Sequence, residues 1–104
     1  MDVAAYCLSK PGAVEDYPFG SETSVFRVVG KMFALTPASE HPCSINLKCD
    51  PVRAMELRET FSKITPGYHM NKLHWNSLDL RGGLLDELVR ELIDHSYDLV
   101  KKKK

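Results

Sequence analysis

Residues 43–61 read CSINLKCDPVRAMELRETF, and this stretch decides the fold class because a strand pattern changes to a helix pattern within it. The alternating apolar residues are Cys43, Ile45, Leu47 and Cys49. Such alternation predicts a strand with one buried face. Asp50 and Pro51 then provide a helix N-cap and a first helical residue, so an amphipathic helix is expected to follow, with Ala54, Leu57 and Phe61 inward.

Residues 25–36, VFRVVGKMFALT, predict a β-hairpin just before this strand. Glycine at the first central position suits a type II′ turn, so we place a two-residue loop at Gly30–Lys31. The resulting register puts four apolar residues on the face toward the helices: Phe26, Val28, Phe33 and Leu35. The preceding residues 15–23 are turn-rich and are expected to form an ordered loop.

Residues 67–80, GYHMNKLHWNSLDL, predict a second hairpin. Residues 74–80 alternate as a strand, with Leu78 and Leu80 toward the core and Trp75 on the outer face. Residues 68–70 are expected to pair back across a tight turn near Asn71–Lys72.

Helices are predicted at both ends of the chain. Asp2 caps a short helix that Pro11–Gly12 terminates, and residues 84–100 carry one apolar stripe. The stripe consists of Leu85, Leu88, Val89, Leu92, Ile93, Tyr97 and Val100. The prediction is a two-layer α+β domain over residues 1–104, in the order α-β(3)-α-β(2)-α, with an antiparallel sheet and helices on one face. Lysines 101–104 form a flexible tail that complements the helix dipole or meets an anionic partner.

Composition narrows the functional classes. Fourteen Lys and Arg balance fourteen Asp and Glu, so any nucleic-acid or lipid binding must come from a local patch. There is no apolar run long enough to span a bilayer and no signal-peptide pattern at the start, so a cytoplasmic location is expected.

The sequence shows no pattern of catalytic or cofactor chemistry. Three cysteines without C-x-x-C spacing argue against a disulfide framework or zinc site, and Cys43 and Cys49 are interpreted as small core residues. His69 and His74 lie five residues apart, a spacing that only a tight hairpin would bring together. We find no nucleophile elbow or phosphate loop, and therefore expect a protein that is not an enzyme and needs no cofactor or metal. An unrecognised enzyme or small-ligand binder is the remaining alternative.

Two surfaces are candidates for binding. The outer sheet face is predicted to carry Arg27, Ser44, Asn46, Lys48, Trp75 and Ser77. An exposed tryptophan is a common anchor for a protein partner, unless another segment covers it. The second hairpin offers basic and amide groups that suit phosphates and base edges, unless it is only a solvated tip.

Five segments resemble the MmcQ/YjbR-like family of small bacterial proteins. They are PGAVEDYPFG, GKMFAL, INLKCDP, PGYHMNKLHWNSLDL and ELIDHSYDLV, and they run in family order from Pro11 to Val100. The resemblance implies a frataxin-like or secretion-chaperone-like shape and binding of double-stranded DNA through two hairpin wings. Carried to this chain, the candidate DNA-binding residues are Lys31, Lys48, His69, Asn71, Lys72, His74 and Asn76. The alternative is a protein-interaction module that uses Arg27, Asn46, Lys48 and Trp75, by analogy of fold.

Overall fold

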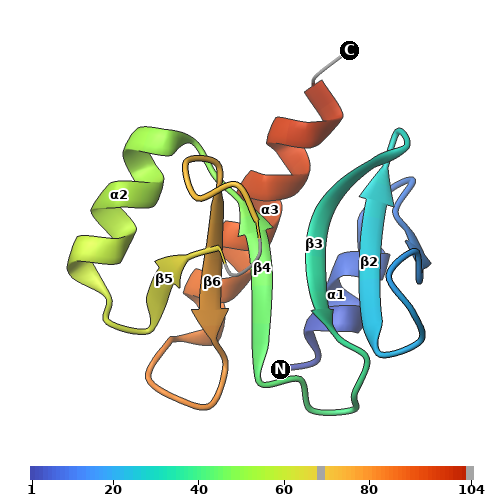
Figure 1. Cartoon of the computed structure of the whole chain (residues 1–104), viewed down its shortest axis with the longest axis horizontal. Helices are drawn as coiled ribbons and strands as arrows, with labels where there is room; N and C mark the ends of the chain where they lie inside the picture. Colours follow the sequence, from blue (N-terminus) through green and yellow to red (C-terminus); the bar gives the residue numbers. More distant parts are fainter. Residues whose placement is uncertain (68–69, 103–104) are drawn as a thin grey trace.

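In a computed structural model that describes residues 1–67 and 70–102, six strands form one antiparallel sheet and three helices pack against it (Figure 1). The helices are α1 (Val3–Ser9), α2 (Pro51–Thr60) and α3 (Asp86–Lys102). The strands are β1 (Val14–Asp16), β2 (Thr23–Val28), β3 (Lys31–Pro37), β4 (Ser44–Lys48), β5 (Ile64–Pro66) and β6 (Trp75–Asp79). Their order across the sheet is β1-β2-β3-β4-β6-β5.

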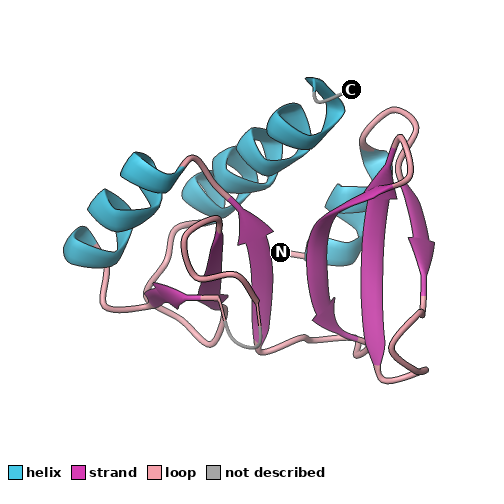
Figure 2. Ribbon diagram, turned by 45° about the horizontal axis from the view of Figure 1, so that its top comes forward, coloured by secondary structure: helices cyan, strands magenta, loops and turns pink. Residues whose placement is uncertain are grey.

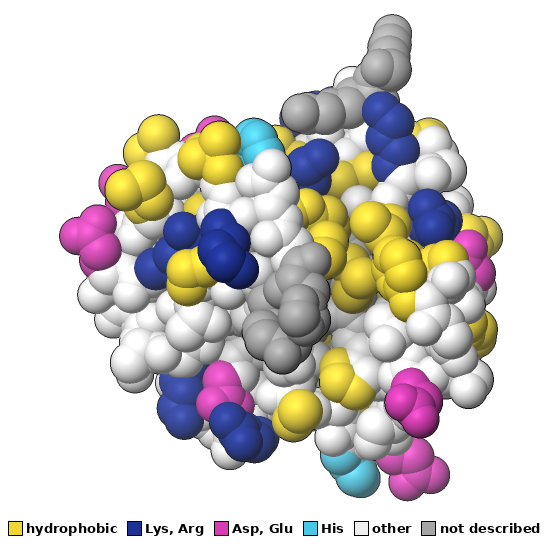
Figure 3. Space-filling model, in the orientation of Figure 1, with side chains coloured by type: hydrophobic (Ala, Val, Ile, Leu, Met, Phe, Trp, Pro, Cys, Tyr) yellow, Lys and Arg dark blue, Asp and Glu magenta, His cyan; other side chains and the backbone are white. Residues whose placement is uncertain are grey.

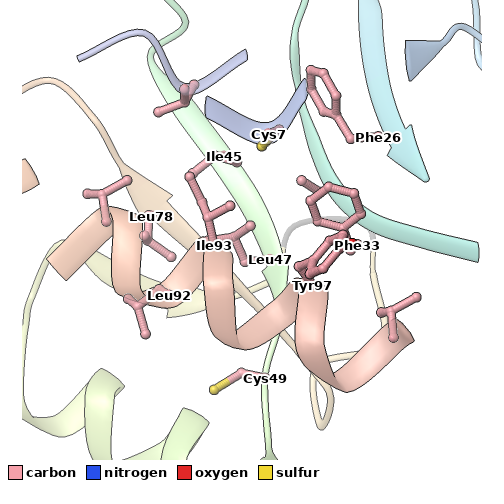
Figure 4. Packing of buried hydrophobic residues seen from close by; sticks show 14 of the residues in the cluster. Cys7, Phe26, Phe33, Ile45, Leu47, Cys49, Leu78, Leu92, Ile93 and Tyr97 are labelled. Atoms are coloured by element: carbon pink, nitrogen blue, oxygen red, sulfur yellow. The ribbon is translucent and has the colours of Figure 1, made fainter. Parts of the chain in front are cut away.

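The helices and the main core lie on one face of the sheet (Figure 2). α3 packs on β3 and β4, α1 contacts α3, and α2 lies beside β5. Aliphatic and aromatic residues from both layers form this core, and Phe33 meets Tyr97 edge to face with ring centroids 5.4 Å apart (Figure 4). The two-layer α+β prediction is therefore confirmed.

Two strands depart from the predicted order. Residues 15–23 were expected to form a loop because they are turn-rich, but residues 15 and 16 belong to β1, which pairs with β2 from Val14–Arg27 onward. The strand paired with β6 is β5, at residues 64–66 rather than 68–70. Pro66 is tolerated there because β5 is an edge strand. Residues 68 and 69 lie outside the described residues.

The β2–β3 hairpin turns one residue earlier than predicted. Val28 pairs with Lys31, so the loop residues are Val29 and Gly30, both with positive φ (47° and 77°) as a type I′ turn requires. The ladder then shifts between Phe26 and Arg27, which leaves Phe33 as the extra residue of a bulge.

The bulge changes which side of β3 faces the helices. Phe33 and Ala34 both join the main core, and Leu35 is turned to the opposite face. The predicted inward position of Leu35 was therefore wrong. A second small cluster forms on this outer face from Val25, Leu35 and Trp75, with Met32 and Met70 packed against it.

The helix ends follow the predicted caps. The Asp2 carboxylate accepts a hydrogen bond from Ala5 N at 3.0 Å, and the Asp50 carboxylate accepts one from Arg53 N at 3.1 Å. Two predicted core residues are exposed instead. Leu85 precedes the first turn of α3, and Cys43 precedes β4. Both residues therefore lie outside the regular element whose repeat predicted that they face the core. No helix among the described residues is long and apolar enough to cross a bilayer.

β3 and β4 share only a short ladder at the centre of the sheet. Their register consists of Ala34–Leu47 and Leu35–Asn46. Next to this ladder, the Ser96 hydroxyl of α3 bridges the two strands. It donates to Phe33 O of β3 at 2.5 Å and accepts from Lys48 N of β4 at 3.0 Å. Ser96 is fully buried and thus connects the two halves of the sheet through the helix.

Candidate nucleic-acid interface

Lysines from four separate elements gather at one end of the sheet. β3 and β6 begin at this end and β4 finishes there, as the pairing of Lys48 with Trp75 shows. α3 also ends there, beside the β2–β3 hairpin (Figure 1). We call this region the cationic end, defined by Lys31, Lys48, Lys72, Lys101 and Lys102.

The β2–β3 hairpin presents the first of these lysines. Lys31 is exposed directly after the turn. Arg27 stabilises the turn and links it to β1. Its guanidinium donates to Gly30 O at 3.4 Å and to the Asp16 carboxylate at 3.1 Å. The hairpin predicted as one wing is therefore present and held against β1.

The second predicted wing has a different form. The link between β5 and β6 runs from Gly67 to His74, and the tight two-residue turn at Asn71–Lys72 was wrong. The Asn71 carboxamide oxygen accepts from Leu73 N at 2.9 Å, and Asn71 O accepts from Trp75 N at 3.0 Å. The Lys72 ammonium donates to Gly67 O at 3.1 Å, and no acidic side chain pairs with it among the described residues.

Arg58 of α2 fastens this loop to the body of the protein. Its Nε donates to the Asn76 side-chain oxygen at 2.6 Å, and its Nη2 donates to Trp75 O at 3.2 Å and to Lys72 O. The planar guanidinium thus serves three acceptors on one segment. No local sequence pattern identifies this role of Arg58, which joins residues far apart in the chain.

The structure brings together only part of the predicted DNA-binding set. Lys31, Asn71 and Lys72 are exposed, while Lys48 and His74 are half-buried. Asn76 was wrongly predicted as a contact: its side chain faces α2, donates to Ala54 O at 3.4 Å, and is only 2 % exposed. His69 lies outside the described residues.

The end of α3 adds cations that were predicted only as a tail. Lys101 and Lys102 are exposed in its last turn, and Lys101 Nζ lies 5.5 Å from the centroid of the Tyr97 ring. His95 contributes no charge here. Its pKa is lowered, first by burial and then by the charge of Arg53, and its Nε2 accepts from Asp50 N at 3.2 Å.

Charge is unevenly distributed over the outer face. Figure 3 shows Lys and Arg side chains around its upper half, with acidic side chains toward its margins and lower edge. At the lower edge Asp79 meets Lys63 at 3.6 Å and Arg81 at 3.0 Å. Hydrogen bonds from Arg81 hold the pKa of Asp79 well below its usual range, so its carboxylate offsets part of the positive charge of Lys63 and Arg81. Acidic side chains also lie near the cationic end: Asp50, which caps α2, and Asp98 of α3 are both exposed.

The predicted partner surface around Trp75 is not as expected. Trp75 lies on the outer face as predicted, but it is only 7 % exposed because it packs in the cluster with Val25, Leu35 and Met70. Arg27 is paired with Asp16, and the Ser77 hydroxyl donates to the Asn46 side chain, so these groups hold the face together. A hollow of about 630 Å³ remains beside them, and the apolar part of its lining comes from Phe19, Leu35, Pro37 and Met70.

The described residues contain no group of three or more His, Cys, Asp or Glu side chains arranged to hold a metal ion. Cys7 and Cys49 are buried, and burial raises the pKa of the Cys7 thiol to about 12.

Comparison with known proteins places this architecture in a family. Over 84 residues the chain is 40 % identical to the uncharacterised protein YbdF of Escherichia coli O157:H7, covering 81 % of this chain and 69 % of YbdF. It is 32 % identical over 96 residues to the uncharacterised protein YjbR of E. coli K12, and the match covers 92 % of this chain and 81 % of YjbR.

Solved structures agree with these sequence relatives. The crystal structure of DR2400 from Deinococcus radiodurans superposes with a TM-score of 0.89 at 43 % identity, covering 98 % of this chain and 78 % of DR2400. A Pseudomonas syringae protein gives a TM-score of 0.77 at 29 % identity over 92 % of this chain and 93 % of its own. Residues 8–99 match the family described as YjbR, and the chain belongs to the YjbR family.

Proposed function

We propose that this chain is a nonenzymatic protein that binds double-stranded DNA through the cationic end. The observation that carries the proposal is the convergence of lysines from β3, β4, α3 and the loop before β6 on one end of a protein whose formal net charge is zero. Such a local patch is the electrostatic footprint of phosphate binding.

The geometry of the cationic end favours contacts to a backbone with regularly spaced phosphates. Lys31 and Lys72 lie on separate projections, and Lys101 and Lys102 extend from the helix layer behind them. Each lysine that neutralises a phosphate releases condensed counterions, so binding is expected to weaken steeply as salt rises. These contacts position a duplex but read no bases, so weak sequence preference is expected.

The test is a fluorescence-anisotropy titration with a labelled duplex at several salt concentrations. Lys31→Gln and Lys72→Gln are each expected to reduce the slope of log K against log salt by about 0.9 and to weaken binding to every sequence. The matched control is Lys63→Gln, because Lys63 is an exposed lysine at the opposite end of the sheet. Duplex binding that is absent, or that responds equally to all three changes, would contradict the proposal.

The competing hypothesis was a protein partner on the outer sheet face. Its basis was an exposed indole, and the burial of Trp75 removes that anchor. Binding of phosphates by the lysines of the cationic end needs no such anchor, so the burial of Trp75 weakens only the protein-partner hypothesis.

A further inference from the structure

Each of the two projections of the cationic end carries an exposed apolar residue beside its lysine. Val29 is 62 % exposed, next to the Gly30–Lys31 pair, and Leu73 is 57 % exposed, directly after Lys72. Exposed apolar side chains at turn tips add no core packing. Their position beside cations calls for a role outside the folding of the domain.

Val29 is also held in an unfavourable backbone conformation. Its φ of 47° lies in the left-handed region, which disfavours β-branched residues and favours Gly or Asn. Strain of this kind is costly to the fold and concentrates at binding sites. Arg27 braces the same turn through Gly30 O, so the valine side chain is presented by a supported backbone.

Leu73 is presented on a preorganised loop. Its N–H is bonded to the Asn71 side chain, and Arg58 holds the carbonyl of the preceding Lys72. Residues 71–75 are already held by these hydrogen bonds, so this segment loses little conformational entropy on binding.

The spacing of the two projections suits a duplex lying across this end of the sheet. The β2–β3 turn and the start of β6 are separated by about two and a half strand positions, or at least ~12 Å at a strand spacing of ~4.8 Å. That distance corresponds to several base steps at ~3.4 Å each. The flanking Lys31 and Lys72 would then meet phosphates beside the two points of contact.

We propose, on the basis of the proposed function, that Val29 and Leu73 are apolar wedges that enter the minor groove at two base steps and bend the bound duplex. Minor-groove proteins combine such wedges with Lys or Arg contacts and kink DNA by about 20–90°. Preference for easily deformed pyrimidine–purine steps follows, since their deformation costs less than that of stiff sequences.

The experiment measures bending separately from binding. A duplex of about 30 base pairs, labelled at its two ends with a donor and an acceptor, is saturated with the full chain, and energy transfer reports the end-to-end distance. The wild type is expected to shorten that distance. Val29→Asn and Leu73→Gln are each expected to reduce the shortening and the double variant to abolish it, with the salt slope unchanged because no lysine is lost.

One control variant and the choice of asparagine at position 29 make the result decisive. Leu85→Gln replaces an exposed leucine at the opposite end of the sheet, 75 % exposed, and should leave the bend unchanged. Val29→Asn relieves the positive φ, so a lost bend cannot come from unfolding. If the wild type binds the duplex without bending it, or if the variants bend the duplex as much as the wild type does, the role of Val29 and Leu73 as wedges is overturned while the proposed DNA binding stands. A wild type that binds no duplex would overturn both this inference and the proposed function.

Discussion

Arg58→Met is expected to destabilise the protein strongly although Arg58 lies on a surface helix. The substitution removes the hydrogen bond to Asn76, whose side chain is 2 % exposed, together with the bonds to Trp75 O and Lys72 O. A hydrogen bond from a charged donor contributes about 1.5–3 kcal/mol, and the buried Asn76 oxygen is left without that donor. We expect a loss of about 3 kcal/mol, or a fall in Tm of about 12–24 °C for a domain of this size.

The assay uses urea unfolding followed by the emission of Trp75, the single tryptophan of the chain. Trp75 lies under the loop that Arg58 holds, so its native emission should also shift to longer wavelength in the variant. The matched control is Arg53→Met on the same helix. It breaks only an exposed pair with Glu91 and should cost about 0–1 kcal/mol. Equal effects of the two substitutions would refute the account of Arg58.

Three further outcomes are expected. Gly67→Ala should destabilise by about 1–3 kcal/mol in urea unfolding, because an added Cβ would lie 2.7 Å from Trp75 Cβ; an unchanged midpoint would contradict this close approach. Burial raises the pKa of Asp94, but hydrogen bonds from Lys10 and a tyrosine outweigh it and the net pKa is lowered, so the carboxylate stabilises the fold above pH ~4 and loses this effect as pH falls. Asp94→Asn should therefore lower the free energy of unfolding by about 1 kcal/mol at pH 7. The difference in unfolding free energy between variant and wild type should shrink as the pH falls, and a difference that stays constant in acid would refute this. Of the three cysteines, only the exposed Cys43 should react quickly with a thiol reagent in the native protein, and all three should react in denaturant; fast labelling of a second native thiol would be inconsistent with the core.

Elements with strong local signals could be predicted from the sequence. The caps at Asp2 and Asp50 and the alternation of residues 43–49 depend on neighbouring residues, and all three led to the correct element. The turn at Val29–Gly30 could not be found this way. A type I′ turn usually begins with Asn, Asp or Gly, so a valine there directed the prediction to the next position.

The predictions that failed depend on contacts between distant segments. Trp75 was placed on the correct face, but its burial depends on the return of the loop that carries Met70. The alternation of β3 is interrupted by a bulge at Phe33, which moved Leu35 to the outer cluster. The same limitation applies to the candidate site: Lys31 and Lys72 were named from resemblance, whereas their proximity to the end of α3 is a property of the topology.

The Ser96 hydroxyl has a mechanical consequence for the whole molecule. Two residue pairs, the Ser96 hydroxyl, and the Thr36 hydroxyl, which donates to Ser44 O at 2.8 Å, connect β3 to β4, so the sheet consists of two halves joined by a short ladder. Each half carries one of the two projections, so a change in the twist between the halves would alter the distance between Val29 and Leu73. Helix α3 therefore contributes, through Ser96, to the distance between the two projections.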